Sequence, residues 1–260
     1  MSLLTAPDTQ TGLGLPASPD AVIRLENVSV RYRVPTERIG TFKEYAIRHI
    51  QGRVRYQDFW ALRGISLDIQ QGEIFGIIGR NGAGKSTLLK VISRVLAPTQ
   101  GRVWIKGRVS PLLELGAGFH PELTGRENIF LNGSLLGHKR CEIDLKLDEI
   151  LDFAEIGAFI DTPLRTYSSG MAARLGFAVA TAWQPETLIL DEVLAVGDEA
   201  FQAKCQARME TFRNNGTTTL LVTHNMDVVR LLCRRAAWLD HGSLRALGAA
   251  DEVVKAYQAG

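Results

Sequence analysis

The sequence has few cysteines and no long uncharged apolar run. Its three cysteines, Cys141, Cys205 and Cys233, are odd in number and lack the close spacing of a metal site, so we expect buried thiols in a reducing compartment. No uncharged apolar run approaches the roughly 18 residues of a membrane-spanning helix, and we expect no span of the bilayer. The N-terminus has neither a basic start nor an apolar segment, which argues against a secretory signal.

A strong charge of one sign is also missing. The net charge is only +2 over 260 residues, which gives no sign of a nucleic-acid partner. The 45% of hydrophobic residues is enough for a full core. Residues 1–21 are rich in Ser, Thr, Pro and Gly and are predicted to be a disordered tail, and residues 22–260 are predicted to fold.

The most informative stretch is Ile74–Lys90, which contains the pattern Gly-x4-Gly-Lys-Ser. The apolar run Ile74–Ile78 predicts a buried strand and Ser86–Ala97 predicts a helix, so the glycines fall on the turn between them. Glycines there let successive backbone N–H groups converge on one anion, and the helix N-terminus adds partial positive charge. The pattern predicts a phosphate-binding loop, and the flanking elements argue against a chance glycine-rich turn.

Two side chains of this loop have distinct expected roles. Lys85 is expected to bridge terminal phosphates, and the Ser86 hydroxyl is expected to hold Mg²⁺. The residues of the loop expected to contact the ligand are Gly79, Arg80, Asn81, Gly82, Ala83, Gly84, Lys85, Ser86 and Thr87.

Before the loop, two alternating segments predict half-buried strands. The first contains Val28–Val34 and the second Ile65–Ile69. Between them, residues 35–58 have apolar positions on one helical face together with several arginines. This inserted segment is either an ordinary surface helix covering the sheet or a basic amphipathic element that contacts a partner or the membrane surface.

After the loop, two helix starts stand out. Thr124-Gly-Arg-Glu127 matches a capping box. Ser168-Ser169-Gly170 precedes a predicted apolar helix, Met171–Trp183. The N-terminus of that helix is either a second anion site or an ordinary helix start.

Polar residues follow two further apolar runs. Asp191 and Glu192 follow Leu188–Leu190, and this order suits an Asp that holds Mg²⁺ through water and a Glu that activates the attacking water. His224 follows the predicted strand Thr217–Val222, at the edge where open α/β sheets bind ligands. A single histidine is more often structural than catalytic, so both interpretations remain open for His224.

The order of these motifs resembles the ATP-binding subunits of ABC transporters, from about Ile23 to Tyr257. Tyr167–Met171 is similar to the signature motif of that family, and Leu188–Glu192 to its second nucleotide strand. Ala195–Asp198 is similar to the loop that follows this strand, and His224 to the switch histidine.

The resemblance implies binding of ATP with Mg²⁺ and hydrolysis. It implies catalytic roles for Glu192 and His224, and Mg²⁺ contacts for Ser86 and Asp191. It also implies that Tyr32 stacks on adenine, although the alternation of its strand fits simple packing. Outside the loop, the other residues implied to contact nucleotide are Ser168, Ser169, Gly170, Met171 and Asp198.

The sequence departs from the family pattern at two places. The signature has Ser169 where the family usually has glycine and Met171 where it usually has glutamine. The loop that normally carries a glutamine toward Mg²⁺ has Glu114 and Leu115 instead, and neither is identified as its replacement.

Within the family, the sequence resembles the branch that exports polysaccharides such as O-antigen, teichoic acid, capsule and galactan. The residues that carry this resemblance are Leu115–Asn128, Phe59–Leu62 and the inserted segment 35–58. It implies an α/β, RecA-like P-loop core with an antiparallel β subdomain and a helical subdomain near 124–184. It also implies a homodimer, a separate membrane permease, a polyprenyl-linked glycan substrate, and a peripheral position on the cytoplasmic face of the bacterial inner membrane.

Three other functions were weighed. A nucleotide switch is disfavoured because no Asn-Lys-x-Asp guanine-reading motif occurs and because Glu192 favours hydrolysis. A soluble ABC ATPase acting on DNA or ribosomes would have long coiled-coil arms or two ATPase units, which this sequence lacks. Export of a lipid or drug remains the alternative within transporters.

Overall fold

The computed structural model describes residues 20–35, 56–112, 116, 118–191 and 197–260. Its strands are β1 (Ala21–Pro35), β2 (Tyr56–Gln70), β3 (Ile74–Ile78), β4 (Gln100–Ile105), β5 (Val109–Pro111), β6 (Thr187–Asp191), β7 (Thr218–Val222), β8 (Arg235–Asp240) and β9 (Ser243–Ala249). Its helices are α2 (Lys85–Ile92), α3 (Gly125–Leu135), α4 (Arg140–Ala154), α5 (Ser169–Ala180), α6 (Glu199–Asn214), α7 (Met226–Leu232) and α8 (Ala250–Ala259), with two 3₁₀ turns, η1 (Gly157–Asp161) and η2 (Leu164–Thr166).

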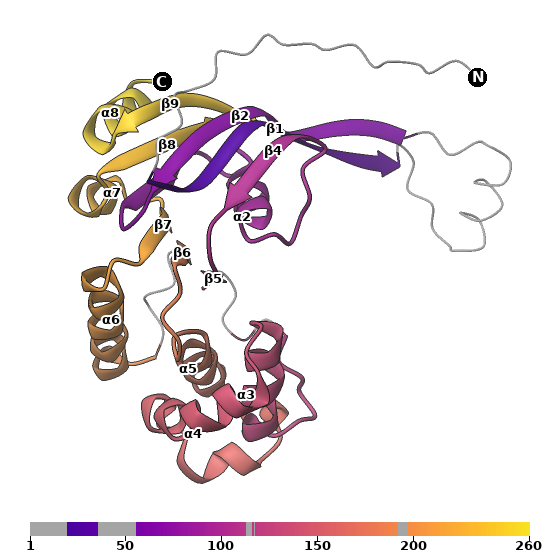
Figure 1. Ribbon diagram of the computed structural model, residues 1–260, viewed down its shortest axis with the longest axis vertical. Coiled ribbons are helices and arrows are strands. Elements are labelled where there is room, and N and C mark those ends of the chain that lie inside the picture. Colours follow the sequence, from indigo (N-terminus) through magenta and orange to yellow (C-terminus); the bar gives the residue numbers. More distant parts are fainter. Residues whose placement is uncertain (1–19, 36–55, 113–115, 117, 192–196) are drawn as a thin grey trace, which may run out of the picture.

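The described strands form two sheets. One is antiparallel, with the order β2-β1-β4, and the other has six strands in the order β5-β6-β7-β3-β8-β9. Within the larger sheet the pairs from β5 to β8 are parallel, and β9 pairs antiparallel with β8. One hydrophobic cluster contains residues of both sheets and of α2, so the two sheets enclose this helix (Figure 1).

The sequence explains why the two sheets differ. Strands β3 and β7 are short apolar runs that are buried almost throughout, as in parallel sheets covered on both faces. Strand β1 alternates instead over part of its length, where the partly exposed Arg24 separates the buried Ile23 and Leu25, because one of its faces meets solvent there. The fold class expected from the sequence, an α/β core with an antiparallel β subdomain and a helical subdomain, is confirmed.

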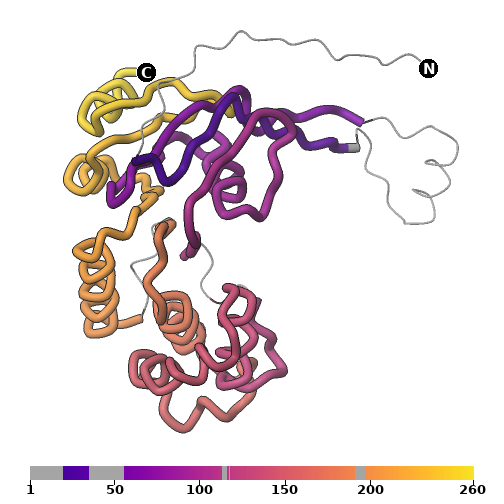
Figure 2. The backbone as a smooth tube through the Cα atoms, viewed as in Figure 1, coloured from indigo at the N-terminus to yellow at the C-terminus, as the bar shows by residue number. Residues whose placement is uncertain are grey.

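Helices α3, α4 and α5 gather at the end of the molecule opposite the antiparallel sheet, and the C-terminal helix α8 packs against β8 and β9 (Figure 2). These three helices share a second hydrophobic cluster, separate from the one under the sheets. The predicted capping box starts α3: the Thr124 hydroxyl accepts a hydrogen bond from the Glu127 amide at 3.2 Å, and the Glu127 carboxylate accepts one from the Thr124 amide at 2.8 Å.

Two predicted helix boundaries were wrong. The helix after the phosphate loop was expected to reach Ala97 but ends at Ile92, because Arg94 adopts a left-handed conformation with φ 60°. The helix expected over Met171–Trp183 is α5, which begins earlier, at Ser169, because the Ser168 side chain caps it.

The last helix, α8, has Ala249 as its N-cap, and no side chain makes a capping hydrogen bond there. Asp251 lies in the first turn, where its negative charge favours the positive end of the helix dipole.

Several expectations lie outside the described residues. They concern the predicted tail up to residue 19, the inserted segment at 36–55, the two candidates Glu114 and Leu115, and residues 192–196, which include Glu192. Within the part of the chain that is described, no helix combines the length and the apolarity needed to cross a bilayer.

The expectation of three buried thiols was wrong for one cysteine. Cys205 and Cys233 are buried, with 1% and 7% of their surface exposed, but Cys141 in the first turn of α4 is exposed. Burial raises the pKa of the Cys205 thiol to about 11 and that of Cys233 to about 12. Thiolate formation at these two residues is therefore suppressed at neutral pH.

This difference predicts selective labelling. In the native protein at pH 8, a disulfide reagent such as DTNB should modify about one thiol per chain, at Cys141, because only the accessible thiol can form a reactive thiolate. The Cys141→Ser variant should lose that native reaction, and both proteins should react fully once unfolded in guanidinium. Rapid labelling of the native Cys141→Ser variant would contradict the buried positions of Cys205 and Cys233.

Candidate functional site

The register of three parallel strands brings the candidate motifs to one edge of the large sheet. Asp191, the last residue of β6, pairs with Val222, the last residue of β7, and Val222 in turn pairs with Ile77 of β3. The phosphate loop leaves β3 one residue later, and His224 follows β7. Since all three strands run in the same direction, their polar extensions emerge side by side, at the edge where α/β sheets bind ligands.

The phosphate loop is tightly held between the two sheets. Gly79 and Gly84 have φ values of 150° and 105°. A side chain at Gly79 would lie 2.2 Å from the Leu239 carbonyl oxygen, and one at Gly84 would lie 2.7 Å from that of Ala61. Only glycine fits at these two positions, so their identity is set by the close approach of neighbouring backbone as well as by the turn.

Lys85 extends back over the loop. Its ammonium donates hydrogen bonds to the backbone carbonyls of Gly79, at 2.6 Å, and of Arg80, at 3.1 Å. Lys85 also begins α2, so the positive end of the helix dipole points toward the loop. The first turn of α2 contains no acidic residue that would offset this partial charge. Arg80, Asn81 and Ser86 are exposed. The loop therefore presents a cation, a helix N-terminus and a hydroxyl to solvent on one side, which suits a phosphate chain.

The structure describes only part of Asp191 and Glu192, the two carboxylate residues expected beside this loop. The backbone of Asp191 ends β6 at the same sheet edge, while its side chain and all of Glu192 lie outside the described residues. Their assignment as Mg²⁺ ligand and general base therefore stays a prediction, supported by the position of the end of β6.

His224 lies between the end of β7 and the start of α7. The preceding Thr223 is buried, and its hydroxyl accepts a hydrogen bond from the Asn225 amide at 3.0 Å. Asn225 then caps α7 by accepting hydrogen bonds from the Asp227 and Val228 amides. His224 itself is exposed. His224 is therefore not packed in the core, and its role at the sheet edge stays a prediction.

The second candidate anion site, the N-terminus of α5, lies away from the phosphate loop. Ser168 is the N-cap of α5, and its hydroxyl accepts a hydrogen bond from the Met171 amide at 3.1 Å. Ser169 is exposed, and Gly170 is partly exposed. Helix α5 packs with α3 and α4, far along the long axis from α2 (Figure 1). Within one chain, the structure does not bring the Ser168–Met171 motif to the phosphate loop.

Asp198, expected to contact nucleotide, has two partners inside the chain. Its carboxylate caps α6 by accepting a hydrogen bond from the Phe201 amide at 3.0 Å, and it pairs with the Arg174 guanidinium of α5 at 2.7 Å. Arg174 also lies over the Phe201 ring and 3.6 Å from Glu155. Arg174 was missed by the sequence analysis, because a single arginine on a predicted helix gives no sign of a partner 24 residues away.

Tyr32 extends from β1 on the same face as the buried Val30, with 37% of its surface exposed. It therefore lies at the border between the core and the surface. The stacking of Tyr32 on adenine stays a prediction.

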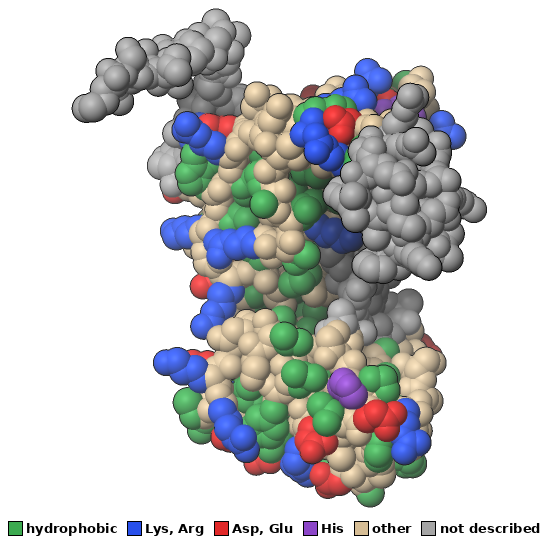
Figure 3. Space-filling view, turned by 90° about the vertical axis from the view of Figure 1, so that its right-hand side faces the viewer, with side chains coloured by type: hydrophobic (Ala, Val, Ile, Leu, Met, Phe, Trp, Pro, Cys, Tyr) green, Lys and Arg blue, Asp and Glu red, His purple; other side chains and the backbone are tan. Residues whose placement is uncertain are grey.

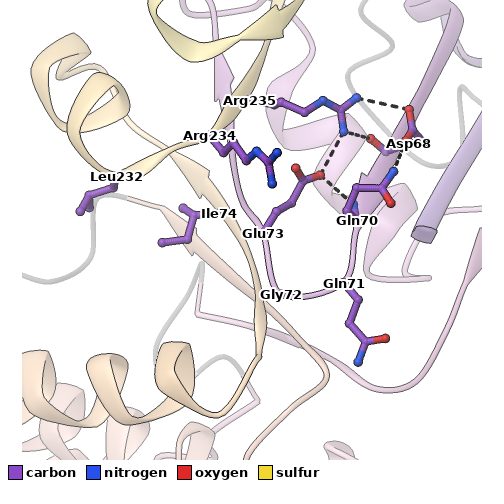
Figure 4. Close-up of a pocket in the computed structure, with 9 residues that line it drawn as sticks. All are labelled: Asp68, Gln70, Gln71, Gly72, Glu73, Ile74, Leu232, Arg234 and Arg235. Atoms are coloured by element: carbon purple, nitrogen blue, oxygen red, sulfur yellow. Dashed lines mark hydrogen bonds and ion pairs between the residues drawn. The ribbon is translucent and has the colours of Figure 1, made fainter. Parts of the chain in front are cut away.

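A polar cavity of about 500 Å³ lies away from this edge. It is beside Ile74 and Arg235, the first residues of β3 and β8, at the opposite ends of these strands from the phosphate loop. Figure 4 shows Arg235 pairing with Asp68 at 3.3 Å and with Glu73 at 3.2 Å. Burial raises the pKa of the Glu73 carboxyl. These groups satisfy one another across the β2–β3 turn, as in a structural ion cluster.

The contrast between two loop glycines gives a test of the loop geometry. Alanine at Gly84 would meet the Ala61 carbonyl oxygen, whereas a Cβ at Gly82 would meet no atom within 4 Å. Both residues have positive φ, so a backbone cost of about 1–2 kcal/mol is common to both variants. Gly84→Ala should lower the free energy of unfolding more than Gly82→Ala does. The difference should be at least about 1 kcal/mol, which is the lower limit for the cost of overpacking. Urea denaturation measures this difference, and equal losses would mean that the β2 backbone does not press on the loop.

Comparison with known proteins places this geometry in a family. The sequence model of the family described as "ABC transporter" matches residues 62–195, about half of the chain. An O-antigen export system ATP-binding protein, RfbB, from Klebsiella pneumoniae is 44% identical over 242 residues, covering 92% of this chain and 98% of that protein.

For other relatives, this chain matches only about half of their length. The RfbB protein of Myxococcus xanthus is 50% identical over 248 residues, and the chain spans 57% of its length. The teichoic acids export ATP-binding protein TagH of Enterococcus faecalis is 47% identical over 201 residues, and the chain spans 45% of its length.

Solved structures share the fold at lower sequence identity. The dimeric, post-hydrolysis ATP-binding cassette MJ0796, bound to ADP and Pi, has a TM-score of 0.66 and 23% identity, covering 88% of this chain. A solved ATP-binding subunit of an ABC transporter has a TM-score of 0.68 and 21% identity, covering 91% of this chain. With the matching family model and a relative covered along nearly its whole length, the chain belongs to the ABC transporter family and has the fold of its ATPase domain.

Proposed function

We propose that this chain binds ATP with Mg²⁺ and hydrolyses it to power export of a lipid-linked polysaccharide through a separate membrane permease. One observation carries the proposal. The Gly79–Lys85 loop, the end of β6 and His224 share one sheet edge, in a chain that is 44% identical along nearly the whole of an O-antigen export ATP-binding protein.

The loop supplies the phosphate contacts. Backbone N–H groups of the loop and the first turn of α2 bind the phosphate oxygens, and the Lys85 ammonium moves from the Gly79 and Arg80 carbonyls onto the terminal phosphates. The Ser86 hydroxyl and the Asp191 carboxylate are oxygen donors of the kind that Mg²⁺ prefers, so these two residues would hold the ion together with the phosphates. Bound Mg²⁺ would neutralise part of the charge that develops during phosphoryl transfer.

The chemical step requires a base at the same edge. Glu192 directly follows Asp191, the last residue of β6, at the sheet edge that the phosphate loop shares. Glu192 orients a water and accepts its proton as the water oxygen attacks the terminal phosphorus. The bond between that phosphorus and the bridging oxygen then breaks, with ADP as the leaving group. His224, exposed at the end of β7, is placed to donate a hydrogen bond to the terminal phosphate.

The position of α5 supports a site shared between two copies. Ser168, Ser169, Gly170 and Met171 belong to the helical cluster and do not reach the phosphate loop of their own chain. In a homodimer of the kind that the family resemblance implies, this motif would cover the ATP held by the partner's loop, and Asp198 would lie at the same interface. Each ATP would then be enclosed by both copies.

The substrate class and the location rest on the relatives. Two of them are named for O-antigen export and one for export of teichoic acids, which favours a polysaccharide over a drug or an ordinary lipid. The arginines of the inserted segment, Arg48, Arg53 and Arg55, would attract the phosphates of membrane lipids or of a polyprenyl-linked glycan. The chain would act as a peripheral subunit at the cytoplasmic face of the bacterial inner membrane, with no nucleic-acid partner.

The role of Glu192 is tested by Glu192→Gln. The variant should bind ATP as tightly as the wild type while its hydrolysis falls by ~100- to 10,000-fold, the usual contribution of a general base. Calorimetry measures the binding and phosphate release measures the turnover. In cells that contain only this variant, surface polysaccharide should disappear.

Lys85→Ala is the companion variant, because it removes a charged donor to the phosphates. It should weaken ATP binding by at least ~10-fold, the usual effect of losing a hydrogen bond to a charged group. Wild-type turnover in Glu192→Gln would reject the base assignment, and unchanged affinity in Lys85→Ala would reject the loop assignment. Normal surface polysaccharide with an inactive ATPase would reject the export function.

The dimer is tested by Ser169→Arg. A large cation in this exposed position should block closure of two copies, so ATPase activity should be lost while ATP still binds. For the wild type, activity per molecule should rise with protein concentration. Ser134→Arg is a matched control, because Ser134 is also an exposed helical serine, on α3. Constant activity per molecule at concentrations where light scattering detects only monomers would rule out the shared site.

A further inference from the structure

We propose that His138 is a positioning residue for the proposed reaction, which holds the end of α5 against the large sheet while its ring is neutral and releases it when protonated. The inference rests on the proposed function, since it requires that α5 presents the Ser168–Met171 motif to nucleotide. It adds a pH-dependent control to that function. We call Arg108, His138 and Trp183 the His138 cluster; none of them was selected as a site residue from the sequence.

The His138 cluster joins three separate parts of the chain. His138 lies in the turn between α3 and α4, Trp183 lies in the short connection between α5 and β6, and Arg108 directly precedes β5. The Arg108 carbonyl oxygen accepts a hydrogen bond from the Thr187 amide at 3.1 Å, and the Arg108 amide donates one to the Glu186 carboxylate at 2.9 Å. The backbone of Arg108 is therefore fixed to the start of β6, and its side chain reaches the helical end.

Two contacts of the His138 ring hold the cluster together. The ring stacks on the indole ring of Trp183, with 3.8 Å between the ring centroids and 15° between the ring planes. Its Nδ1 atom lies 3.2 Å from a terminal nitrogen of the Arg108 guanidinium. A guanidinium can only donate hydrogen bonds, so Nδ1 is the acceptor, and this requires a neutral ring with its proton on Nε2. The geometry thus selects the neutral form of His138.

Burial strengthens this preference for the neutral ring. On the face of the molecule in Figure 3, charged side chains of the helical end lie at the surface among hydrophobic ones, where water solvates them. The His138 side chain differs, because only 8% of it is exposed. Burial and, to a smaller extent, the charge of Arg108 lower the pKa of His138. The folded chain therefore binds this proton less readily than an unfolded chain does.

The other charged groups around His138 do not reverse the preference. The Glu142 carboxylate of α4 lies 3.7 Å from Nδ1 and favours the protonated ring, but 43% of its side chain is exposed, so solvent weakens the attraction. It also accepts a hydrogen bond from the Lys139 amide at 2.8 Å. The Lys139 residue is exposed, and the Glu186 carboxylate is engaged by the Arg108 amide. The pKa of His138 is lowered in spite of Glu142.

Protonation would open the His138 cluster. An imidazolium carries a donor on both ring nitrogens, so Arg108 would lose its acceptor and two positive charges would face each other. A cavity of about 370 Å³, lined in part by Ser110, Leu136 and Gln184, lies beside the ring and gives it room to turn toward water. The cluster is fully stable above the ordinary histidine pKa, and this stability is lost as the pH falls through the lower pKa of the folded chain.

The position of α5 links the His138 cluster to the reaction. Trp183 lies just after the C-terminal end of α5, and the Ser168–Met171 motif lies at its N-terminal end. Because a helix is a rigid element, a shift at one end is passed to the other. Release of His138 would therefore disturb closure of two copies over ATP and leave the phosphate loop unchanged. We expect kcat to depend on His138, with little change in the ATP affinity of a single chain.

The test compares the ATPase activity of the wild type and of His138→Gln from about pH 8 to about pH 5, the range in which histidine titrates. Glutamine keeps an acceptor for Arg108 but does not titrate, so the two proteins should have similar kcat at the upper end. At the lower end the wild type should lose up to ~10-fold more kcat than the variant, the usual effect of losing a hydrogen bond to a charged group. His120→Gln is the matched control, because His120 is an exposed histidine of the same end of the molecule, and it should keep the wild-type profile.

Nuclear magnetic resonance of histidine-labelled protein measures the titration itself, at the signal that His138→Gln lacks. The midpoint should lie below the ordinary histidine value of 6.5 and coincide with the additional loss of kcat. Arg108→Met should raise the midpoint, because it removes the positive charge beside Nδ1. A midpoint at or above the ordinary value, or one that Arg108→Met leaves unchanged, would reject the His138 cluster even if His138→Gln failed to fold.

The possible outcomes separate this inference from the proposed function. If the wild type hydrolyses ATP and its pH profile coincides with that of His138→Gln, His138 has no positioning role, and the proposed function stands. If His138→Gln lowers kcat equally at every pH, the residue is only structural, and the inference is also wrong. If the wild type hydrolyses no ATP at any pH, the proposed function fails, and the positioning role fails with it.

Discussion

Parallel pairing of β6, β7 and β3 is the constraint on which the site depends. A parallel ladder fixes which residues end together, and here Asp191, Val222 and Ile77 lie in one row across the sheet. The chain segments that leave this row carry the candidate polar groups, so the strands themselves can stay apolar. Glycine at position 79 then follows from the close approach of Leu239 in β8, and glycine at position 84 from that of Ala61 in the second sheet.

A second constraint links the helical end to the sheet edge. Arg174 of α5 pairs with Asp198 at the start of α6 and lies near Glu155 at the end of α4. Lys204 of α6 pairs with Glu155 at 2.7 Å. These groups are partly exposed, so each pair contributes little to stability alone. Because they converge on one place, they tie the positions of α4 and α5 to the first turns of α6.

The sequence predicted best those features that depend on neighbouring residues. The phosphate loop, the capping box at Thr124 and the buried strands are local patterns of spacing and residue type. Errors arose where distant contacts or backbone strain decide the outcome. Cys141 was expected to be buried because its residue type usually is, but it lies on the exposed side of α4. The end of α2 was missed because no residue type announces the left-handed conformation of Arg94.

In the candidate site, too, local features could be predicted from the sequence and distant contacts could not. Residues that precede or follow a recognisable strand, such as Lys85 and His224, could be named in advance. The partnership of Asp198 with Arg174 could not, because helix periodicity shows which side chains share a face but not what lies opposite. In a sheet, likewise, alternation assigns faces within one strand, and only the register between β1 and β2 shows which of their residues stand opposite one another.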